Sequence, residues 1–231
     1  MPLYTADALV LRTYALGEAD RLVVFLTRDR GKKRGVAKSA RRPRSRFTGA
    51  LEPLTEARVA YFESARRELV GLNYAETIRS PLGLTGGAWD PSRVQSSSAA
   101  AEEGLTYAAY FAELLNEWAQ DADADERLYR LGASMLDALA AGAPAESLAR
   151  YFEYWLLRLQ GVYPDASASL SAGARAFLVA ARTAAPHEIG QVAIELKAIR
   201  ELERVHRSLI SMHLEKTLKS DRVLRDLRRH A

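Results

Sequence analysis

Cysteine is absent from this chain of 231 residues. Its absence excludes disulfide bonds and every zinc site that is built on thiolate ligands. Long apolar runs are absent as well, since none approaches the ~18 residues that a membrane-spanning helix needs. The N-terminal stretch MPLYTADALVLR lacks the cationic and then apolar pattern of a secretory signal. We therefore expect a cytoplasmic protein.

The sequence also lacks two motifs of enzymes, because it has no GxxxxGK[ST] loop and no GxSxG turn. Asp121, Asp123 and Asp125 resemble the start of a calcium-binding loop. However, Glu126 stands where such a loop has its turn glycine, and Gly132 stands where it has a bidentate glutamate. We interpret the three aspartates as acids that cap the helix after them.

Histidine is scarce, and its spacing does not favour a metal site. His206 and His213 are seven residues apart, too far for a metal pair at positions i and i+4 of a helix. Glu203 could join His206 at i+3, but a structural or surface role is the better interpretation. The sequence thus predicts no enzyme, no cofactor and no metal site.

Acidic residues are missing from one segment in particular, residues 31–51. Residues 31–47 carry a charge of +8, whereas the whole chain carries +4, so the rest has 4 − 8 = −4. Holding like charges together costs energy that a polyanion relieves, and a phosphate backbone is the commonest such partner. We expect these cations to stay unpaired within the fold and to bind DNA. They are Lys32, Lys33, Arg34, Lys38, Arg41, Arg42, Arg44 and Arg46.

Phe47 lies among these cations and is the aromatic residue best placed by sequence to stack on an unpaired base. Tyr14, Phe25, Tyr61 and Phe62 could also stack, but positions in the core suit them better. Two other interpretations of the basic segment stay open: a solvated loop that resists aggregation, and a site for an acidic protein or a membrane surface.

Residues 1–80 have the patterns of five short strands, such as the buried run RLVVFLT. Five strands with one long basic connection suit a small closed barrel of the oligonucleotide/oligosaccharide-binding (OB) type. Residues 81–98 are rich in Pro, Gly and Ser and indicate a linker. Residues 99–231 have helical periodicity, so we expect an α+β protein with an OB-fold barrel followed by an all-α bundle.

The terminal helix that we expect from about Ser220 is basic. Its arginines could favour the helix dipole and solubility, or form a second anion site. They are Arg222, Arg225, Arg228 and Arg229.

The chain resembles the bacterial RecO family of recombination mediators along most of its length. The strongest part is residues 8–62, where early strands, a GVAK-like strand, the basic segment and a LEP-type strand start follow in the family's order. YFAELL, RYFEYWLLRLQGVYPD and HLEKTLKSDRVL resemble the family's helical signatures. The family carries a four-cysteine zinc module in many members, near residues 165–172 here, and this chain lacks it.

The resemblance implies a non-enzymatic protein that binds single- and double-stranded DNA, anneals complementary strands and helps to load RecA with RecR and RecF. It also implies contact with single-stranded-DNA-binding protein and a cytoplasmic, nucleoid-associated location. The alternative function is an adaptor whose basic loop binds an acidic protein or RNA.

Overall fold

The computed structural model describes residues 1–64, 66–81, 83, 99–164, 170–215, 218–220 and 223–224. Its contacts divide the chain into two compact units, Met1–Leu136 and Asp137–Ala231. No helix of the described ranges combines the length and the apolar character that crossing a bilayer requires. The boundaries expected at residues 80 and 99 stay a prediction.

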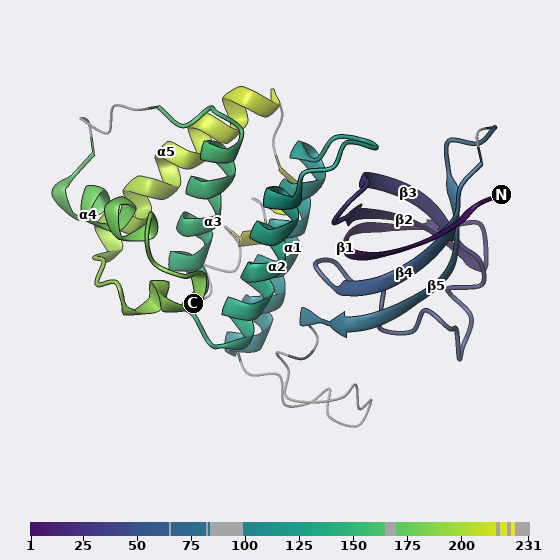
Figure 1. Cartoon of the computed structure of the whole chain (residues 1–231). Helices are drawn as coiled ribbons and strands as arrows, with labels where there is room; N and C mark the ends of the chain where they lie inside the picture. Colours follow the sequence, from purple (N-terminus) through teal and green to yellow (C-terminus); the bar gives the residue numbers. More distant parts are fainter. Residues whose placement is uncertain are drawn as a thin grey trace. The chain divides into compact units, whose positions relative to one another are not determined.

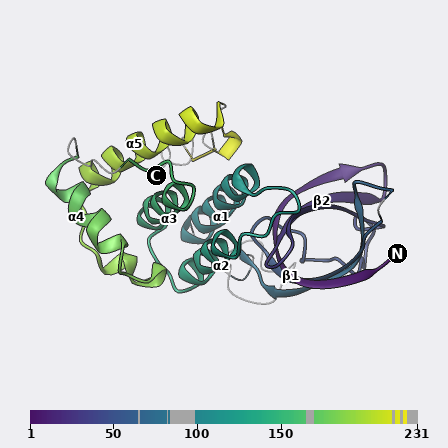
Figure 2. The same cartoon turned by 45° about the horizontal axis from the view of Figure 1, so that its top comes forward.

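The first unit contains a closed five-stranded barrel (Figure 1). Its strands are β1 (Leu3–Leu16), β2 (Asp20–Thr27), β3 (Gly31–Ala37), β4 (Glu56–Phe62) and β5 (Val70–Arg79). The order is β1-β2-β3-β5-β4, and the ring closes because β1 pairs with both β2 and β4. Figure 2 looks into this ring, in which only the β3–β5 pair is parallel. The expected OB-type barrel is confirmed.

The barrel core follows from side chains that alternate across each strand. Ala6, Ala8 and Val10 of β1 belong to one apolar core with Val59 and Tyr61 of β4. The hydroxyl of Tyr61 is buried, and this burial raises its pKa to about 12. Tyr61 is therefore neutral at physiological pH and belongs to the core.

Two helices, α1 (Ala99–Trp118) and α2 (Glu126–Ala140), follow the barrel in sequence. Leu9 points to the outer face of β1, yet it is completely buried because α1 packs on this strand. A Cβ on Gly132 would lie 2.7 Å from Leu9 Cδ1 and 2.6 Å from Leu115 Cδ1. The glycine thus permits the close approach of α2 to α1 and to the barrel.

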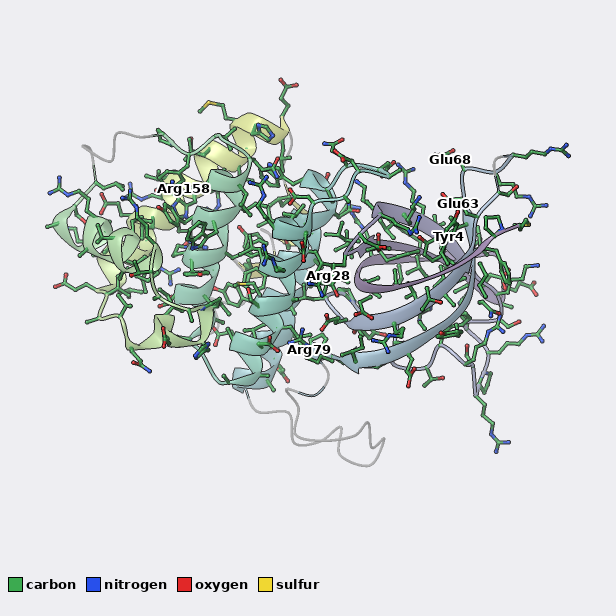
Figure 3. All side chains as sticks on the ribbon, in the orientation of Figure 1. Tyr4, Arg28, Glu63, Glu68, Arg79 and Arg158 are labelled. Atoms are coloured by element: carbon green, nitrogen blue, oxygen red, sulfur yellow. The ribbon has the colours of Figure 1, made fainter. Side chains whose placement is uncertain are left out.

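A polar contact reinforces this packing. The Tyr129 hydroxyl of α2 donates to Glu56 Oε1 at 2.7 Å, and Arg79 Nε donates to Glu56 Oε2 at 2.6 Å. Burial and the bond to Glu56 raise the pKa of Tyr129, which keeps its proton on the shared bond. A second contact of α2 with the barrel is the ion pair of Glu126 with Arg28, at 2.8 Å (Figure 3 labels Arg28 and Arg79). Polar contacts thus hold α2 on the barrel together with the apolar packing.

The second unit is helical, with α3 (Ala145–Leu159), α4 (Ala172–Ala181), the 3-10 helix η3 (Pro186–Gln191) and α5 (Leu196–Leu214). α3 packs against α5 and η3, and α4 packs against α5. The expected helical second half is confirmed for the described residues.

A charged network lies inside this second unit. Arg150 and Glu153 of α3 are each 2% exposed, and Arg150 Nη2 donates to Glu153 Oε1 at 2.6 Å. Arg150 Nη1 lies 3.6 Å from Glu203 Oε2 of α5. Arg207 reaches the other oxygen of Glu203 at 2.6 Å. The network joins α3 to α5 by charge as well as by apolar packing.

His206 is part of the same network and is fully buried. Its Nδ1 lies 3.0 Å from Glu153 Oε2, and its Nε2 lies 3.2 Å from the Tyr163 hydroxyl. Burial lowers the pKa of His206 in spite of the nearby Glu153 carboxylate. Both ring nitrogens are engaged within the fold, which confirms the structural interpretation of this residue.

Candidate nucleic-acid interface

The connection between β3 and β4, residues 38–55, contains most of the basic segment and is firmly anchored. Four of its apolar side chains are at most 3% exposed, namely Phe47, Ala50, Leu51 and Leu54. Three of them, Phe47, Ala50 and Leu51, belong to the barrel core. Leu54 N donates to Val10 O at 2.7 Å, and Val10 N donates to Thr55 O at 2.8 Å. The connection therefore has a defined conformation.

The start of this connection is tied to the turn between β1 and β2. The Asp20 carboxylate accepts a bond from Ser39 N at 2.7 Å, and Arg41 N donates to Ala19 O at 2.9 Å. Arg41 Nη1 donates to Gly17 O at 2.8 Å. Ser39 has φ +57°, which costs a non-glycine residue on the order of 1 kcal/mol. These anchors hold the backbone in that conformation.

Five cations of the connection are exposed on this anchored backbone. Within the described ranges, no carboxylate oxygen lies within 4.0 Å of their charged nitrogens, so they have no internal counter-ion. Arg46 has a non-ionic contact, because its guanidinium lies 5.2 Å from the centre of the Phe47 ring. We call this set the loop cations: Lys38, Arg41, Arg42, Arg44 and Arg46.

For the other three cations, the expectation that they stay unpaired is wrong. Lys33 Nζ lies 2.8 Å from Glu63 Oε1, and Lys32 Nζ lies 3.5 Å from Asp121 Oδ1. Arg34 Nη2 lies 2.9 Å from Asp121 Oδ2. Arg34 also reaches Glu68 at 3.8 Å, and Figure 3 labels Glu63 and Glu68. These three cations already have counter-charges, so the candidate DNA surface begins after them.

Asp121 reaches these cations because its segment pairs with β3. Lys32 N donates to Gln120 O at 3.1 Å, and Ala122 N donates to Lys32 O at 3.0 Å. Gly31 has φ +67°, and a Cβ on it would lie 2.3 Å from the carbonyl oxygen of Asp123. Only glycine satisfies both the backbone angle and this spacing.

Among the three aspartates, only Asp125 is shown to cap α2. Its Oδ1 accepts bonds from Arg127 N at 3.0 Å and from Leu128 N at 3.1 Å. Asp121 is engaged with Lys32 and Arg34 instead. The capping interpretation is thus confirmed for Asp125 and wrong for Asp121. The described residues contain no cluster of three groups that could hold a metal ion.

The expectation that Phe47 stacks on a base does not fit its position. The Phe47 ring is 2% exposed and is part of the barrel core, as are Phe25 and Tyr61. Tyr14 is 43% exposed, and the Arg12 guanidinium lies 5.2 Å from its ring centre. Tyr14 is on the hairpin to which Arg41 is bonded, so among the described aromatic residues it is well placed to stack beside the loop cations.

Sequence reasoning missed two other cations of this region, Arg12 and Arg21. Neither has an ion pair among the described residues, and Arg21 lines a cavity beside the loop cations. Arg12 alternates with apolar residues in β1 and Arg21 directly precedes the apolar run of β2, so both looked like ordinary strand positions. Their nearness to the basic segment arises from the pairing of β2 with β1 and β3.

The expected second anion site cannot be placed in this way. All four of its arginines, Arg222, Arg225, Arg228 and Arg229, lie outside the described residues, as does most of the stretch expected for the zinc module.

In the second unit, Arg158 and Arg182 both donate to the Tyr154 hydroxyl, at 3.0 and 2.9 Å (Figure 3 labels Arg158).

Comparison with known proteins agrees with this arrangement. The family model "Recombination protein O N terminal" matches residues 1–81, and "Recombination protein O C terminal" matches residues 103–186. The DNA repair protein RecO of Koribacter versatilis is 38% identical over 160 residues, which are 69% of this chain and 59% of the relative.

Two other relatives with the same name give similar values. The protein of Anaeromyxobacter sp. strain K is 36% identical over 165 residues, covering 71% of this chain and 59% of the relative. That of Desulforudis audaxviator is 34% identical over 178 residues, covering 76% and 64%. The chain thus spans about three fifths of the length of these relatives. The two family models together match most of the chain, and the chain belongs to the RecO family of DNA repair and recombination proteins.

Proposed function

We propose that this chain is a DNA-binding recombination mediator that acts without catalysing a reaction. One observation carries the proposal: the loop cations are exposed, anchored and without a carboxylate partner among the described residues. Loops at the rim of small five-stranded barrels commonly bind oligonucleotides. Membership of a DNA repair family favours DNA over other polyanions.

Binding of this kind reads the phosphate backbone. Guanidinium and ammonium groups on a turn-rich surface connection can contact successive phosphates, and no recognition helix accompanies them among the described residues. The surface therefore accepts single and double strands with little regard to sequence, and Tyr14 adds stacking where bases are unpaired. If about four loop cations contact single-stranded phosphates, log affinity falls against log salt with a slope of roughly −3.

Annealing follows from the same charge. Two complementary strands repel each other, and a cationic surface that binds both lowers this repulsion. By resemblance to its family, the protein would also act beside RecR and RecF in loading RecA and would contact single-stranded-DNA-binding protein. Co-elution of the purified proteins in gel filtration tests these partners. This role places the protein in the cytoplasm with the nucleoid.

The test reverses three loop cations, with the variant Arg41→Glu, Arg42→Glu, Arg44→Glu. Its matched control reverses three exposed cations of the second unit, Arg175, Lys197 and Arg204. Each reversal changes the charge by −2, so both variants go from +4 to 4 − 6 = −2. Fluorescence anisotropy with a labelled dT30 at several salt concentrations measures the affinity.

We expect the loop variant to bind on the order of 100-fold more weakly, with a salt slope smaller by roughly 2, because three phosphate contacts are lost. The control should bind nearly as the wild type does. Equal weakening of both variants would show that only net charge matters and would refute the loop as the site. If the wild type prefers an acidic peptide or RNA to dT30 at both low and high salt, the adaptor function replaces this one.

A further inference from the structure

A cavity of about 510 Å³ opens where the start of β2 meets the connection 38–55. Part of its wall is the barrel core itself, because Phe47 and Leu51 are only 2% and 3% exposed. The wall is therefore apolar and held in place by packing. The lining residues are Arg21, Ala40, Phe47, Thr48, Gly49, Leu51 and Glu52.

Two side chains of opposite charge face this cavity together, Arg21 and Glu52, and both are half-buried. Neither forms an ion pair or a side-chain hydrogen bond with another described residue. Both groups are thus available to a ligand that enters the cavity. A guanidinium donor and a carboxylate acceptor beside an apolar wall suit a flat polar ligand with both kinds of group on its edge.

The cavity is also flanked by the loop cations. Ala40 directly precedes Arg41, and Phe47 directly follows Arg46, whose guanidinium lies over the Phe47 ring. These cations favour anions on both sides of the cavity, so they suit a ligand that is linked to a phosphate on each side. A base of a nucleic acid strand meets this description.

We propose that the cavity binds one unpaired base of the DNA strand whose phosphates contact the loop cations, and that it prefers guanine. This inference rests on the proposed DNA-binding function. Guanine offers two donors, N1–H and the exocyclic amino group, to the Glu52 carboxylate, and its O6 accepts from Arg21. Thymine offers a single donor, N3–H, so the carboxylate gains less from it.

The Watson–Crick edge of a base is free only when the base is unpaired. The cavity therefore adds a preference for guanine within single strands, which the loop cations alone do not give. Arg21 and Glu52 set this preference, whereas the loop cations set the affinity common to all sequences.

The test uses fluorescence anisotropy with three labelled 15-mers: dT15, d(TTG)5 and d(TTI)5, in which inosine lacks the exocyclic amino group of guanine. The proteins are the wild type, Glu52→Gln, Arg21→Gln and the loop variant described above. Circular dichroism checks that each variant is folded, and Glu52→Gln removes no described side-chain contact. A duplex of d(TTG)5 with its complement serves as the paired control.

We expect the wild type to bind d(TTG)5 about 5-fold more tightly than dT15, with d(TTI)5 between them. Glu52→Gln and Arg21→Gln should each abolish this ratio, because each removes one partner of the guanine edge. The loop variant should weaken all three oligonucleotides and keep the ratio. The duplex should give no preference over a T·A duplex of equal length.

If the wild type binds dT15 and d(TTG)5 equally, or if the ratio survives Glu52→Gln, the base site is wrong, although the DNA-binding function stands. If the wild type binds none of the oligonucleotides, the proposed function itself fails. The two failures are therefore distinguishable in one experiment.

Discussion

The buried pair of Arg150 and Glu153 allows a quantitative prediction for the substitution Glu153→Gln. The change keeps the volume of the side chain and removes its charge. Arg150 would then stay buried, at 2% exposure, with Glu203 as its remaining acidic neighbour at 3.6 Å. Removing one partner of a buried ion pair costs about 3–5 kcal/mol. Because Glu203 compensates part of the charge, we expect the lower end, about 3 kcal/mol.

Native-state hydrogen exchange of α3 and α5 at several urea concentrations measures this loss. A local readout is needed because the two compact units need not unfold together. With a urea dependence of roughly 1.5 kcal/mol/M, the midpoint for these helices should fall by about 2 M. The control is Glu195→Gln, an exposed glutamate next to α5, which should change stability by less than about 0.5 kcal/mol.

The double variant Arg150→Met, Glu153→Gln is a second test of whether the uncompensated guanidinium causes the loss of stability. It leaves no uncompensated guanidinium in the interior, and the glutamine still offers an acceptor to His206. We expect it to be more stable than Glu153→Gln alone. A midpoint for Glu153→Gln within about 0.3 M of the wild type, or a double variant less stable than the single one, would refute the reasoning.

Two other predictions concern His206 and Gly31. The folded state lowers the pKa of His206 below its ordinary 6.5, so below pH 6.5 the unfolded chain binds a proton that the folded one does not. Stability of the α3–α5 pair should therefore fall as the pH drops below 6.5, by at most about 1.4 kcal/mol per pH unit. Urea titrations at pH 7.5 and 5.5 measure this dependence, and His206→Gln should reduce it. The titratable and charged groups that face His206, namely Glu153, Arg150 and Tyr163, are the same in both proteins. In thermal unfolding, Gly31→Ala should destabilise the first unit more than Gly49→Ala does. Both glycines have positive φ (+67° and +76°), but only Gly31 faces the backbone of Asp123. Equal losses of stability would contradict this close contact.

The sequence was sufficient for the barrel because its strands show either alternation or short apolar runs and its connections have turn composition. It also located the loop cations, since an uncompensated run of charge is visible locally. It could not show that Lys33 meets Glu63 or that Arg34 meets Asp121, because those acids lie 30 and 87 residues away along the chain. Pairing of this kind is decided by tertiary contacts, to which a local count of charges is blind.

Other errors have a similar cause. A phenylalanine within a basic run looks exposed, but Phe47 follows a turn that returns the chain to the barrel core. Arg150 and Glu153, at i and i+3 of an amphipathic helix, have the spacing of an ordinary surface pair, and only the packing of α5 on α3 buries them. Arg21 and Glu52 are 31 positions apart in the chain, so no local pattern could join them at one cavity.

The pairing of residues 120–122 with Lys32 also bears on solubility. β5 pairs with β3 only from Gly35 onward, so the first half of that side of β3 would otherwise present free amide and carbonyl groups. Exposed edge strands with unpaired backbone groups can pair with other chains and lead to aggregation. The short segment after α1 covers this part of β3 and so protects it from pairing with another chain. In the Gly31→Ala protein the added methyl group would displace this segment, so that protein should scatter more light on standing than Gly49→Ala does.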